Sequence, residues 1–246
     1  MKLIQAEWEK RNLGIRSCVE MIIENTDDDI DVLNATKNEN AEYVVVKIPP
    51  GKIALARHME NDGYRLVEAS IKLACRLQDF VTAKVAETVA AAIDAVTMGS
   101  LEIERLVAEI HKGIFFTDRV FLGPEFRKEQ AYNRYELWVR DEIQAGGKAY
   151  ECRMNGSPVG FILMKGNPTG VSIPVLLGLY KDHIESGMGA ALIAKLREIV
   201  VKEGTAAVSV TVSSNNIPVF NAYVSSGFRI REIFYVLVKH NSGGHS

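Results

Sequence analysis

The sequence predicts an α+β protein in which a mixed, mostly antiparallel sheet is flanked by helices. One observation is the order of elements expected over residues 100–240, which is two helices, three strands, and then helix, strand, helix, strand. A second is a short echo, in which the pattern of residues 62–68 recurs at 226–232 with a glycine followed by an aromatic residue. A third is size, because 246 residues of which 47% are hydrophobic suit one or two globular domains.

The echo predicts two related units, an N-terminal α/β unit over residues 1–80 and a larger domain over residues 81–240. In the first unit, the β-branched run Tyr43–Ile48 predicts a strand that the prolines after it end. Residues 53–61 fit a helix and residues 64–77 a strand, and the glycine between them is typical of a helix C-cap.

The second unit is predicted to begin within residues 81–96, an Ala/Val-rich segment that fits either a helix or a strand. Two helices follow, with Ser100 as the N-cap of the first and an aromatic-rich loop at 115–126 between them. Each helix has apolar side chains at the spacing that places them on one face. These side chains are Ile103, Leu106, Val107 and Ile110 in the first helix and Tyr135, Trp138, Val139 and Ile143 in the second.

Strands and helices alternate over the rest of the chain, around one mixed sheet. A hairpin is predicted from two extended runs on either side of the turn 155–158, and a second turn at 166–170 leads into a third strand. The strands are expected at 149–154, 159–165, 171–180, 206–212 and 228–238, and the helices at 188–203 and 216–225.

Composition excludes several classes of function. The formal net charge of −2 gives no reason to expect nucleic acid or an anionic membrane as a partner. The N-terminus is charged where a signal peptide is apolar, and no apolar run reaches the roughly 20 residues that span a bilayer, so a cytoplasmic protein is expected. Cys18, Cys75 and Cys152 lack metal-ligand spacing and are interpreted as buried, reduced thiols, and no metal is expected. Residues 241–246 are expected to be a disordered tail.

A glycine-bearing loop joins a predicted strand to an amphipathic helix and ends in Gly187-Met188-Gly189. The first amides of a helix lack intrahelical partners, and the helix dipole is positive at that end. Because glycines allow phosphate oxygens to approach the backbone, the loop is a candidate pyrophosphate site. A Gly-x-Gly before a helix is as often only a tight turn.

Two other phosphate loops are excluded by the residues that follow. A P-loop requires Lys and Ser or Thr where Ala190 and Ala191 stand. A dinucleotide-binding fingerprint requires a third glycine where Leu192 stands.

The short helix after the next strand is predicted to have a polar and aromatic face. Asn216, Phe220 and Tyr223 are spaced at i, i+4 and i+7, which places them on one side of a helix. Ile217 and Val224 are expected to point elsewhere, toward the sheet. A purely structural helix beside a phosphate loop has no need of such a face.

Together these residues resemble the GCN5-related N-acetyltransferase superfamily. Its first motif, Gln/Arg-x-x-Gly-x-Gly/Ala, is matched by Gly187 and Gly189, although Ile184 stands where the superfamily often has Gln or Arg. Its second motif, Asn, six residues, Tyr, three residues, Gly-Phe, is matched by Asn216, Tyr223 and the dipeptide at 227–228. The resemblance covers about residues 100–239.

The resemblance implies the fold of that superfamily, acetyl-CoA as the acetyl donor, and a strand that pairs with the pantetheine arm of the cofactor. The residues it implies for cofactor binding are Leu179, Tyr180, Ile184, Glu185, Ser186, Gly187, Met188, Gly189, Ala190, Asn216, Phe220 and Tyr223.

The resemblance also implies direct attack of an amine on the thioester. Tyr223 is the candidate general acid for the departing thiolate, with simple packing as the structural alternative. Backbone N–H groups near Leu179 and Tyr180 are expected to polarise the carbonyl. The base is not identified: Glu151 and Asp182 are candidates, and a solvated side chain suits Asp182 better.

A narrower resemblance concerns the acceptor. Residues 117–121 and the second helix are similar to acetyltransferases of TDP-linked amino sugars, such as the TDP-fucosamine type, which also carry an N-terminal unit resembling a partial copy of the fold. This similarity implies a nucleotide-linked amino sugar as the small-molecule amine. Arg119, Phe121 and Tyr132 are the candidate acceptor-binding residues, because arginine grips phosphate and aromatic rings stack on a base or sugar. A lid or dimer surface is the alternative interpretation of this segment.

Two other functions are open at this point. Acetylation of a protein or peptide predicts an open groove lined by carboxylates, and no acidic run lies near the glycine loop. A CoA-binding or oligomerising module without catalysis predicts the same motifs. A homodimer is compatible with each function.

Overall fold

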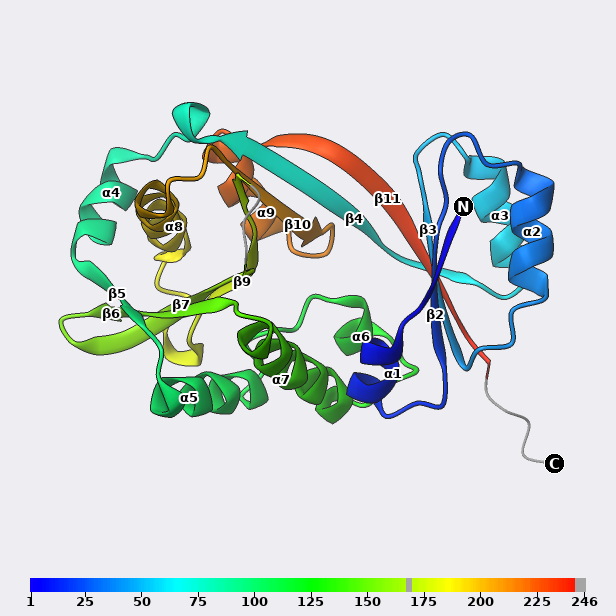
Figure 1. Ribbon diagram of the computed structural model, residues 1–246, viewed down its shortest axis with the longest axis horizontal. Helices are drawn as coiled ribbons and strands as arrows, with labels where there is room; N and C mark the ends of the chain where they lie inside the picture. Colours follow the sequence, from blue (N-terminus) through cyan, green and yellow to red (C-terminus); the bar gives the residue numbers. More distant parts are fainter. Residues whose placement is uncertain (167–169, 242–246) are drawn as a thin grey trace.

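Strands from both ends of the chain build the larger of two β-sheets in this computed structural model, which describes residues 1–166 and 170–241 (Figure 1). The strands are β1 (Lys2–Gln5), β2 (Cys18–Ile22), β3 (Tyr43–Ile48), β4 (Arg65–Arg76), β5 (Ile93–Thr97), β6 (Lys148–Met154), β7 (Ser157–Met164), β8 (Val171–Ser172), β9 (Pro174–Leu179), β10 (Ala207–Ser213) and β11 (Arg229–His240). The α-helices are α1 (Glu7–Leu13), α2 (Asp29–Lys37), α3 (Ile53–Asn61), α4 (Lys84–Ala91), α5 (Ser100–His111), α6 (Arg119–Leu122), α7 (Lys128–Gln144), α8 (Gly189–Glu203) and α9 (Ile217–Ser225). Short 3-10 helices are η1 (Leu77–Asp79) and η2 (Lys181–His183).

The larger sheet has its strands in the order β1-β2-β3-β11-β4-β10-β8. The pairs β2–β3 and β10–β8 are parallel, and the other pairs are antiparallel. The smaller sheet is antiparallel throughout, in the order β5-β6-β7-β9. The predicted mixed, mostly antiparallel architecture is confirmed, but the expectation of one sheet is wrong because β9 and β10 belong to different sheets.

Strand β3 shows why the larger sheet is covered on both faces. Side chains alternate along a strand, so Val44 and Val46 face one side and Tyr43 and Val45 the other. Val44 and Val46 belong to a core cluster with side chains of α2 and α3. The side chains of Tyr43 and Val45 belong to a second cluster with residues of α1, α6 and α7. A strand buried on both faces has a continuous apolar sequence, as this one has.

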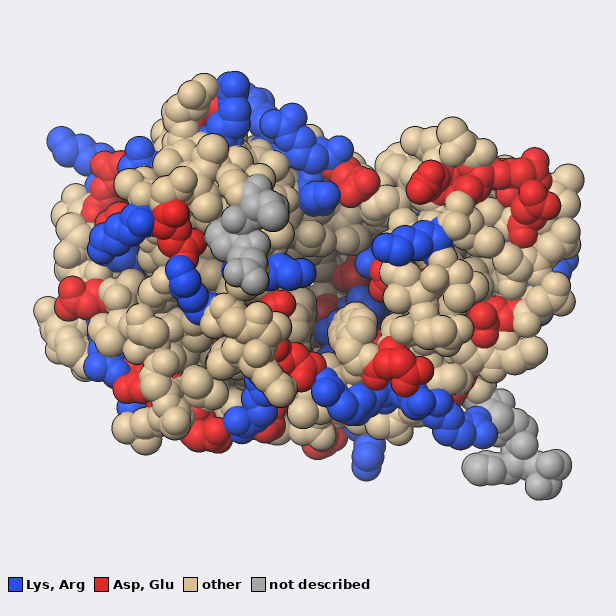
Figure 2. Space-filling model, in the orientation of Figure 1, with Lys and Arg blue, Asp and Glu red and all other residues tan. Residues whose placement is uncertain are grey.

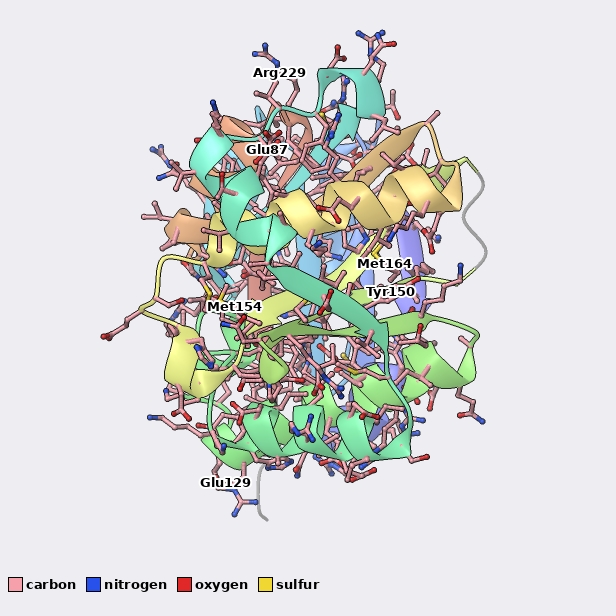
Figure 3. The ribbon with its side chains drawn as sticks, turned by 90° about the vertical axis from the view of Figure 1, so that its left-hand side faces the viewer. Glu87, Glu129, Tyr150, Met154, Met164 and Arg229 are labelled. Carbon is pink, nitrogen blue, oxygen red and sulfur yellow. The ribbon has the colours of Figure 1, made fainter. Side chains whose placement is uncertain are left out.

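The smaller sheet separates α8 from the layer formed by α5 and α7. Figure 3 shows Tyr150, Met154 and Met164 of the β6–β7 hairpin between these two layers. Met164 belongs to the cluster under α8, whereas its neighbour Leu163 packs with α5 and α7. The predicted hairpin and both predicted helices are therefore confirmed.

A structural repeat underlies the short sequence echo. The elements β3, α3 and β4 begin at residues 43, 53 and 65, and β10, α9 and β11 begin at 207, 217 and 229, a constant offset of 164 residues. Gly63 and Gly227 end the two equivalent helices with φ of 93° and 90°, a left-handed conformation that glycine adopts at little cost. The residue after each glycine donates its N–H to a carbonyl five residues back, at 3.0 Å for Tyr64 and 3.1 Å for Phe228.

The two repeats exchange their last strands. Strand β4 pairs with β10 instead of β3, and β11 pairs with β3 instead of β10, so the long strands lie side by side across the molecule (Figure 1). Arg65 pairs with Val238, and the equivalent residues of the other repeat, Arg229 and Ala74, also pair with each other. This correspondence is expected for two strands related by a twofold axis. The division of the chain into residues 1–80 and 81–240 stays a prediction.

Several local expectations are corrected. The segment 171–180 is not one strand, because β8 pairs with β10 and β9 with β7. The N-cap of α5 is Gly99, and Ser100 is its first helical residue. The ambiguous segment 81–96 contains helix α4 and the start of strand β5, and the aromatic loop contains the short helix α6.

Burial of the three cysteines agrees with the sequence interpretation, since Cys18, Cys75 and Cys152 are buried free thiols. No helix within the described ranges is long and apolar enough to cross a membrane. The expected turn at 166–170 lies partly, and the expected tail at 241–246 almost wholly, outside the described residues.

Candidate functional site

A cavity of about 400 Å³ lies between β9, the first turn of α8 and helix α9. Its wall comes from residues 114–117 after α5, residues 177–179 of β9, the loop and helix from 184 to 193, and residues 216–222. Of the residues predicted to bind the cofactor, six line this cavity, namely Leu179, Ile184, Gly187, Gly189, Ala190 and Asn216. The others, which are Tyr180, Glu185, Ser186, Met188, Phe220 and Tyr223, do not line it.

The glycine loop presents free amides to this cavity. Ser186 accepts the Met188 N–H at 3.3 Å through its hydroxyl oxygen, and the Ala191 N–H donates to the Met188 carbonyl at 2.9 Å. The N–H groups of Gly187, Gly189 and Ala190 have no acceptor among the described residues. These three amides open a helix of 15 residues, whose dipole is positive at this end. The predicted anion site is thus structurally available.

The two glycines of the loop differ in whether the backbone requires them. Gly187 has φ of 76°, which strains any residue with a Cβ. A Cβ built at Gly189 meets no atom within 4 Å and would occupy open space. The packing of the fold therefore does not require glycine at position 189.

Strand β9 borders the cavity with an edge that pairs with no other strand in the described part of the chain. It is the end strand of the smaller sheet, bonded to β7 on one side. The Tyr180 N–H donates to the Val159 carbonyl at 3.0 Å, so this amide is engaged. Because backbone groups alternate in an antiparallel ladder, the Leu179 N–H points to the free edge. Of the two amides expected to polarise a carbonyl, Leu179 is the one left available.

Asn216 connects the cavity to the start of α9. Its carboxamide oxygen accepts the Val219 N–H at 3.3 Å, and its own N–H donates to the Ser213 carbonyl at 3.0 Å. Asn216 is thus the N-cap of α9, and proline at the following turn is the residue favoured there.

Tyr223 lies in the core beside the cavity wall. Its ring is 4% exposed and meets Phe228 edge-on at 4.9 Å between centroids. Burial raises the pKa of its hydroxyl well above the ordinary value. The preceding residue, Ala222, lines the cavity, whereas Tyr223 does not. The role of Tyr223 as a general acid stays a prediction.

The predicted orientation of α9 is wrong in part. Phe220 and Tyr223 pack against the core cluster under α8. Ile217 and Val224, which were expected to face the sheet, are 63% and 44% exposed. The helix turns its aromatic side inward because that side carries the larger apolar surface.

The two candidate bases are not free to act on the cavity. Glu151 is fully buried and accepts hydrogen bonds at 2.6 Å from both Arg105 and Arg153, and at 3.2 Å from the Tyr180 hydroxyl. Asp182 is exposed in η2 and does not line the cavity, which agrees with the expectation of a solvated side chain.

The predicted acceptor residues form two groups, and none of them lines the cavity. Arg119 belongs to a buried charge cluster, where its guanidinium donates to Glu9 at 2.7 Å. Phe121 and Tyr132 lie 6.0 Å apart between ring centroids, with the Lys128 ammonium 5.1 Å from the Phe121 ring. Their part in acceptor binding stays a prediction.

Sequence reasoning named no individual site residue in the segment 114–117, although this segment forms one wall of the cavity. Its signal was present as the aromatic pair Phe115-Phe116, in the region assigned to the acceptor. Phe116 is 44% exposed although it is a large apolar side chain. An exposed aromatic ring at a cavity mouth is typical of a ligand-contacting position.

Comparison with solved structures shows that this chain has the fold of the GCN5-related N-acetyltransferases. A protein of unknown function from Staphylococcus epidermidis ATCC 12228 superposes with a TM-score of 0.65 at 11% identity, over 95% of this chain and 88% of that one. A GCN5-related N-acetyltransferase from Sphaerobacter thermophilus gives a TM-score of 0.58 at 14% identity, over 97% and 75%. One from Kribbella flavida gives 0.53 at 18% identity, over 93% and 82%. No protein-family model and no curated protein matches the sequence.

Proposed function

We propose that the protein transfers the acetyl group of acetyl-CoA to the amine of a small molecule. The observation that carries this proposal is the set of three amides at Gly187, Gly189 and Ala190, without an acceptor among the described residues, which open onto the cavity at the start of α8. Amides at a helix N-terminus bind phosphate oxygens, and acetyl-CoA carries a diphosphate. The fold shared with N-acetyltransferases supports the same donor.

The residues around the cavity fit the rest of the donor. The pantetheine arm contains amide groups, which can pair with an exposed strand edge as an added strand does. The free edge of β9 borders the cavity at Leu177 and Leu179. Bound acetyl-CoA supplies a thioester whose carbonyl carbon an amine attacks.

Two groups of this chain have assigned tasks in that reaction. The Leu179 N–H lies on the free edge of β9 and donates to the carbonyl oxygen as negative charge develops. Tyr223 keeps its hydroxyl proton at neutral pH, since burial raises its pKa, and gives that proton to the thiolate that leaves.

The Tyr223→Phe variant tests the general-acid assignment. General acids contribute roughly 10²–10⁴-fold to rate, so kcat should fall by about that factor while the affinity for acetyl-CoA is unchanged. Release of CoA from acetyl-CoA is measured with glucosamine, a TDP-linked amino sugar and a lysine-containing peptide as acceptors. Tyr235→Phe is the matched control, because Tyr235 packs in the cluster under α2 and α3.

Two outcomes reject parts of the proposal. If Tyr223→Phe has the same kcat as Tyr235→Phe, the assignment of Tyr223 as the general acid is rejected. A wild-type protein that is stabilised against heat by acetyl-CoA but releases no CoA with any of the three amines is a binding module instead of an enzyme.

The TDP-linked amino sugar is the acceptor that the sequence favours, and it is therefore included in the amine panel. Arg119, the residue expected to grip its diphosphate, already pairs with Glu9 at 2.7 Å. A nucleotide-linked acceptor therefore needs another cation, whereas a small amine without phosphate needs none. Faster turnover of the lysine peptide than of both sugars would replace the small-molecule acceptor with a protein.

A further inference from the structure

Glu68 lies where the two repeats meet and is linked to the lining of the cavity through Ser213. It is carried by β4 of the first repeat, and the strand exchange places β4 beside β10 of the second repeat. Its Oε2 accepts a hydrogen bond of 2.5 Å from the Ser213 hydroxyl, and Ser213 is the last residue of β10. The Ser213 carbonyl accepts the N–H of Asn216, which lines the cavity.

The other carboxylate oxygen of Glu68 faces the guanidinium of Arg119. Its Oε1 is 3.8 Å from Nη1 of Arg119, a residue two positions after the cavity-lining Thr117. Glu68 thus lies between Arg119 and Ser213, which neighbour the cavity-lining segments 114–117 and 216–222 along the chain. Figure 2 shows the surface hollowed near the centre of this face, below β4 and β11 and above α6 in the view of Figure 1, with charged side chains inside.

The surrounding charges leave Glu68 without a full counter-charge. Arg119 and Arg134 donate to the two oxygens of Glu9 at 2.7 and 2.8 Å, so Glu9 takes the short contacts of both guanidiniums. Asp118 adds a third carboxylate as the N-cap of α6, and its Oδ2 is buried without a partner among the described residues. Three carboxylates against two guanidiniums leave one negative charge that a cation can balance.

The hydrogen bond between Glu68 and Ser213 has no counterpart at the equivalent positions of the two repeats. The residue 164 positions after Glu68 is Glu232, and the residue 164 positions before Ser213 is Pro49, which has no hydroxyl to donate. Helix α2 precedes β3 as α8 precedes β10. The Asp28 carboxylate caps the first amides of α2, so they are not free to bind an anion. The free amides and the held carboxylate therefore occur together in the second half, where the cavity lies.

We propose that Glu68 binds the ammonium group of the acceptor and takes its proton, so that the first repeat supplies a catalytic carboxylate to the second. This inference rests on the proposed function. The amine nitrogen gives a proton to the Glu68 carboxylate and bonds to the thioester carbonyl carbon. The carbon–sulfur bond breaks and the thiolate takes a proton from Tyr223. The acylated nitrogen then releases its second extra proton, which restores the Tyr223 hydroxyl. The products are the N-acetylated amine and free CoA, and Glu68 then returns its proton to water.

The test compares Glu68→Gln with Glu232→Gln, which makes the same change at the equivalent, 48% exposed side chain of the other repeat. The panel is again glucosamine, the TDP-linked amino sugar and the lysine peptide, and the amine with the highest kcat/KM is used. Loss of a general base costs roughly 10²–10⁴-fold in rate, so Glu68→Gln should lose about that much in kcat/KM for the amine. Glu232→Gln should retain the wild-type value, and the KM for acetyl-CoA should not change in either.

The pH profile separates a base from a structural residue. With Glu68 present, the ammonium form binds and is deprotonated in place, so kcat/KM should vary little near neutral pH. In the Glu68→Gln variant, only the free neutral amine reacts, and kcat/KM should rise by about tenfold per pH unit. Without acetyl-CoA, the amine should stabilise the wild-type protein and Glu232→Gln against heat, but not Glu68→Gln.

Each failure has its own signature. Equal rates and equal pH profiles for Glu68→Gln and Glu232→Gln overturn the role of Glu68 and leave acetyl transfer standing. A wild type without turnover on any panel amine overturns acetyl transfer itself. If Glu68→Gln does not fold, Glu68→Asp decides, because a carboxylate withdrawn by one methylene should lower kcat/KM and a wild-type value would overturn the role.

Discussion

At the scale of single residues, the buried ion group around Glu9 joins α1 to α6 and α7. Glu9 is 1% exposed and bonds to both Arg119 and Arg134. Burial alone raises the pKa of this carboxyl, but the two guanidiniums outweigh it and hold the pKa below its ordinary value of 4.5. A buried charge of this kind stabilises the fold only while its partners remain in place.

Glu9→Gln is expected to lower the free energy of unfolding by about 3–5 kcal/mol at pH 7, because two guanidiniums stay buried without their counter-charge. Because the folded-state pKa is lowered, the contribution of Glu9 is complete above about pH 4.5 and is lost as the pH falls through the folded value. Urea unfolding at pH 7 and pH 3 measures this, and the difference between wild type and variant should shrink at pH 3. Glu7→Gln, at a side chain 71% exposed on the same helix, is the control and should change stability little. Equal stability of the two variants at pH 7 would contradict the prediction.

At the scale of elements, the two glycines at the start of α8 differ in whether the fold requires them. Gly187 needs its glycine for a backbone conformation, whereas Gly189 has an ordinary conformation and open space around its Cβ position. Gly227 differs from Gly189, because a Cβ at Gly227 would lie 2.3 Å from the Asp79 carbonyl oxygen. A side chain at Gly189 therefore affects the cavity more than the fold.

Gly189→Val is expected to weaken acetyl-CoA binding by about tenfold or more, because its branched side chain covers the amides that the diphosphate needs. The stability cost should be small, since glycine and valine both have modest helix propensity and differ by about 0.5 kcal/mol. Calorimetric titration with acetyl-CoA and thermal unfolding measure the two effects. Gly227→Val should show the reverse pattern of severe destabilisation, and unchanged acetyl-CoA affinity in Gly189→Val would count against the anion site.

At the scale of the whole molecule, strand exchange makes the two repeats interdependent. Strand β4 completes the sheet of the second repeat and β11 that of the first, so neither repeat has its own full sheet. The central cluster of Val236 and Val238 packs with α1, α6 and α7, which come from both sides of residue 80. Backbone hydrogen bonds and apolar contacts thus cross between the repeats along the whole of β4 and β11.

The full chain is therefore expected to unfold in one cooperative transition, and residues 1–80 alone are expected not to fold. Far-ultraviolet circular dichroism follows the whole molecule, and fluorescence follows Trp8 and Trp138, which both pack on Arg134. The two probes should give coincident melting curves. Two separated transitions, or a dispersed amide spectrum for the 1–80 fragment, would show that the repeats are independent.

The amino-acid sequence by itself determined the local elements and the order of the motifs. Hydrophobic spacing and turn residues are local signals, so helix α3, strand β3 and the β6–β7 hairpin were predicted close to their observed bounds. The glycine loop was found in the same way, because the need of Gly187 for a left-handed backbone is a property of that residue. About half of the predicted cofactor residues line the cavity for this reason.

Tertiary structure alone decided which strands pair and which side chains meet. Backbone hydrogen bonds are the same for every residue, so no local pattern showed that β4 pairs with β10 or that β8 and β9 enter different sheets. The exchange brings Glu68 to Ser213 across 145 residues of chain, and the aromatic side of α9 turns inward because the core on that side offers more apolar contact. Sequence periodicity reports which face of an element is apolar, but the neighbour that covers this face is chosen by the packing of the whole chain.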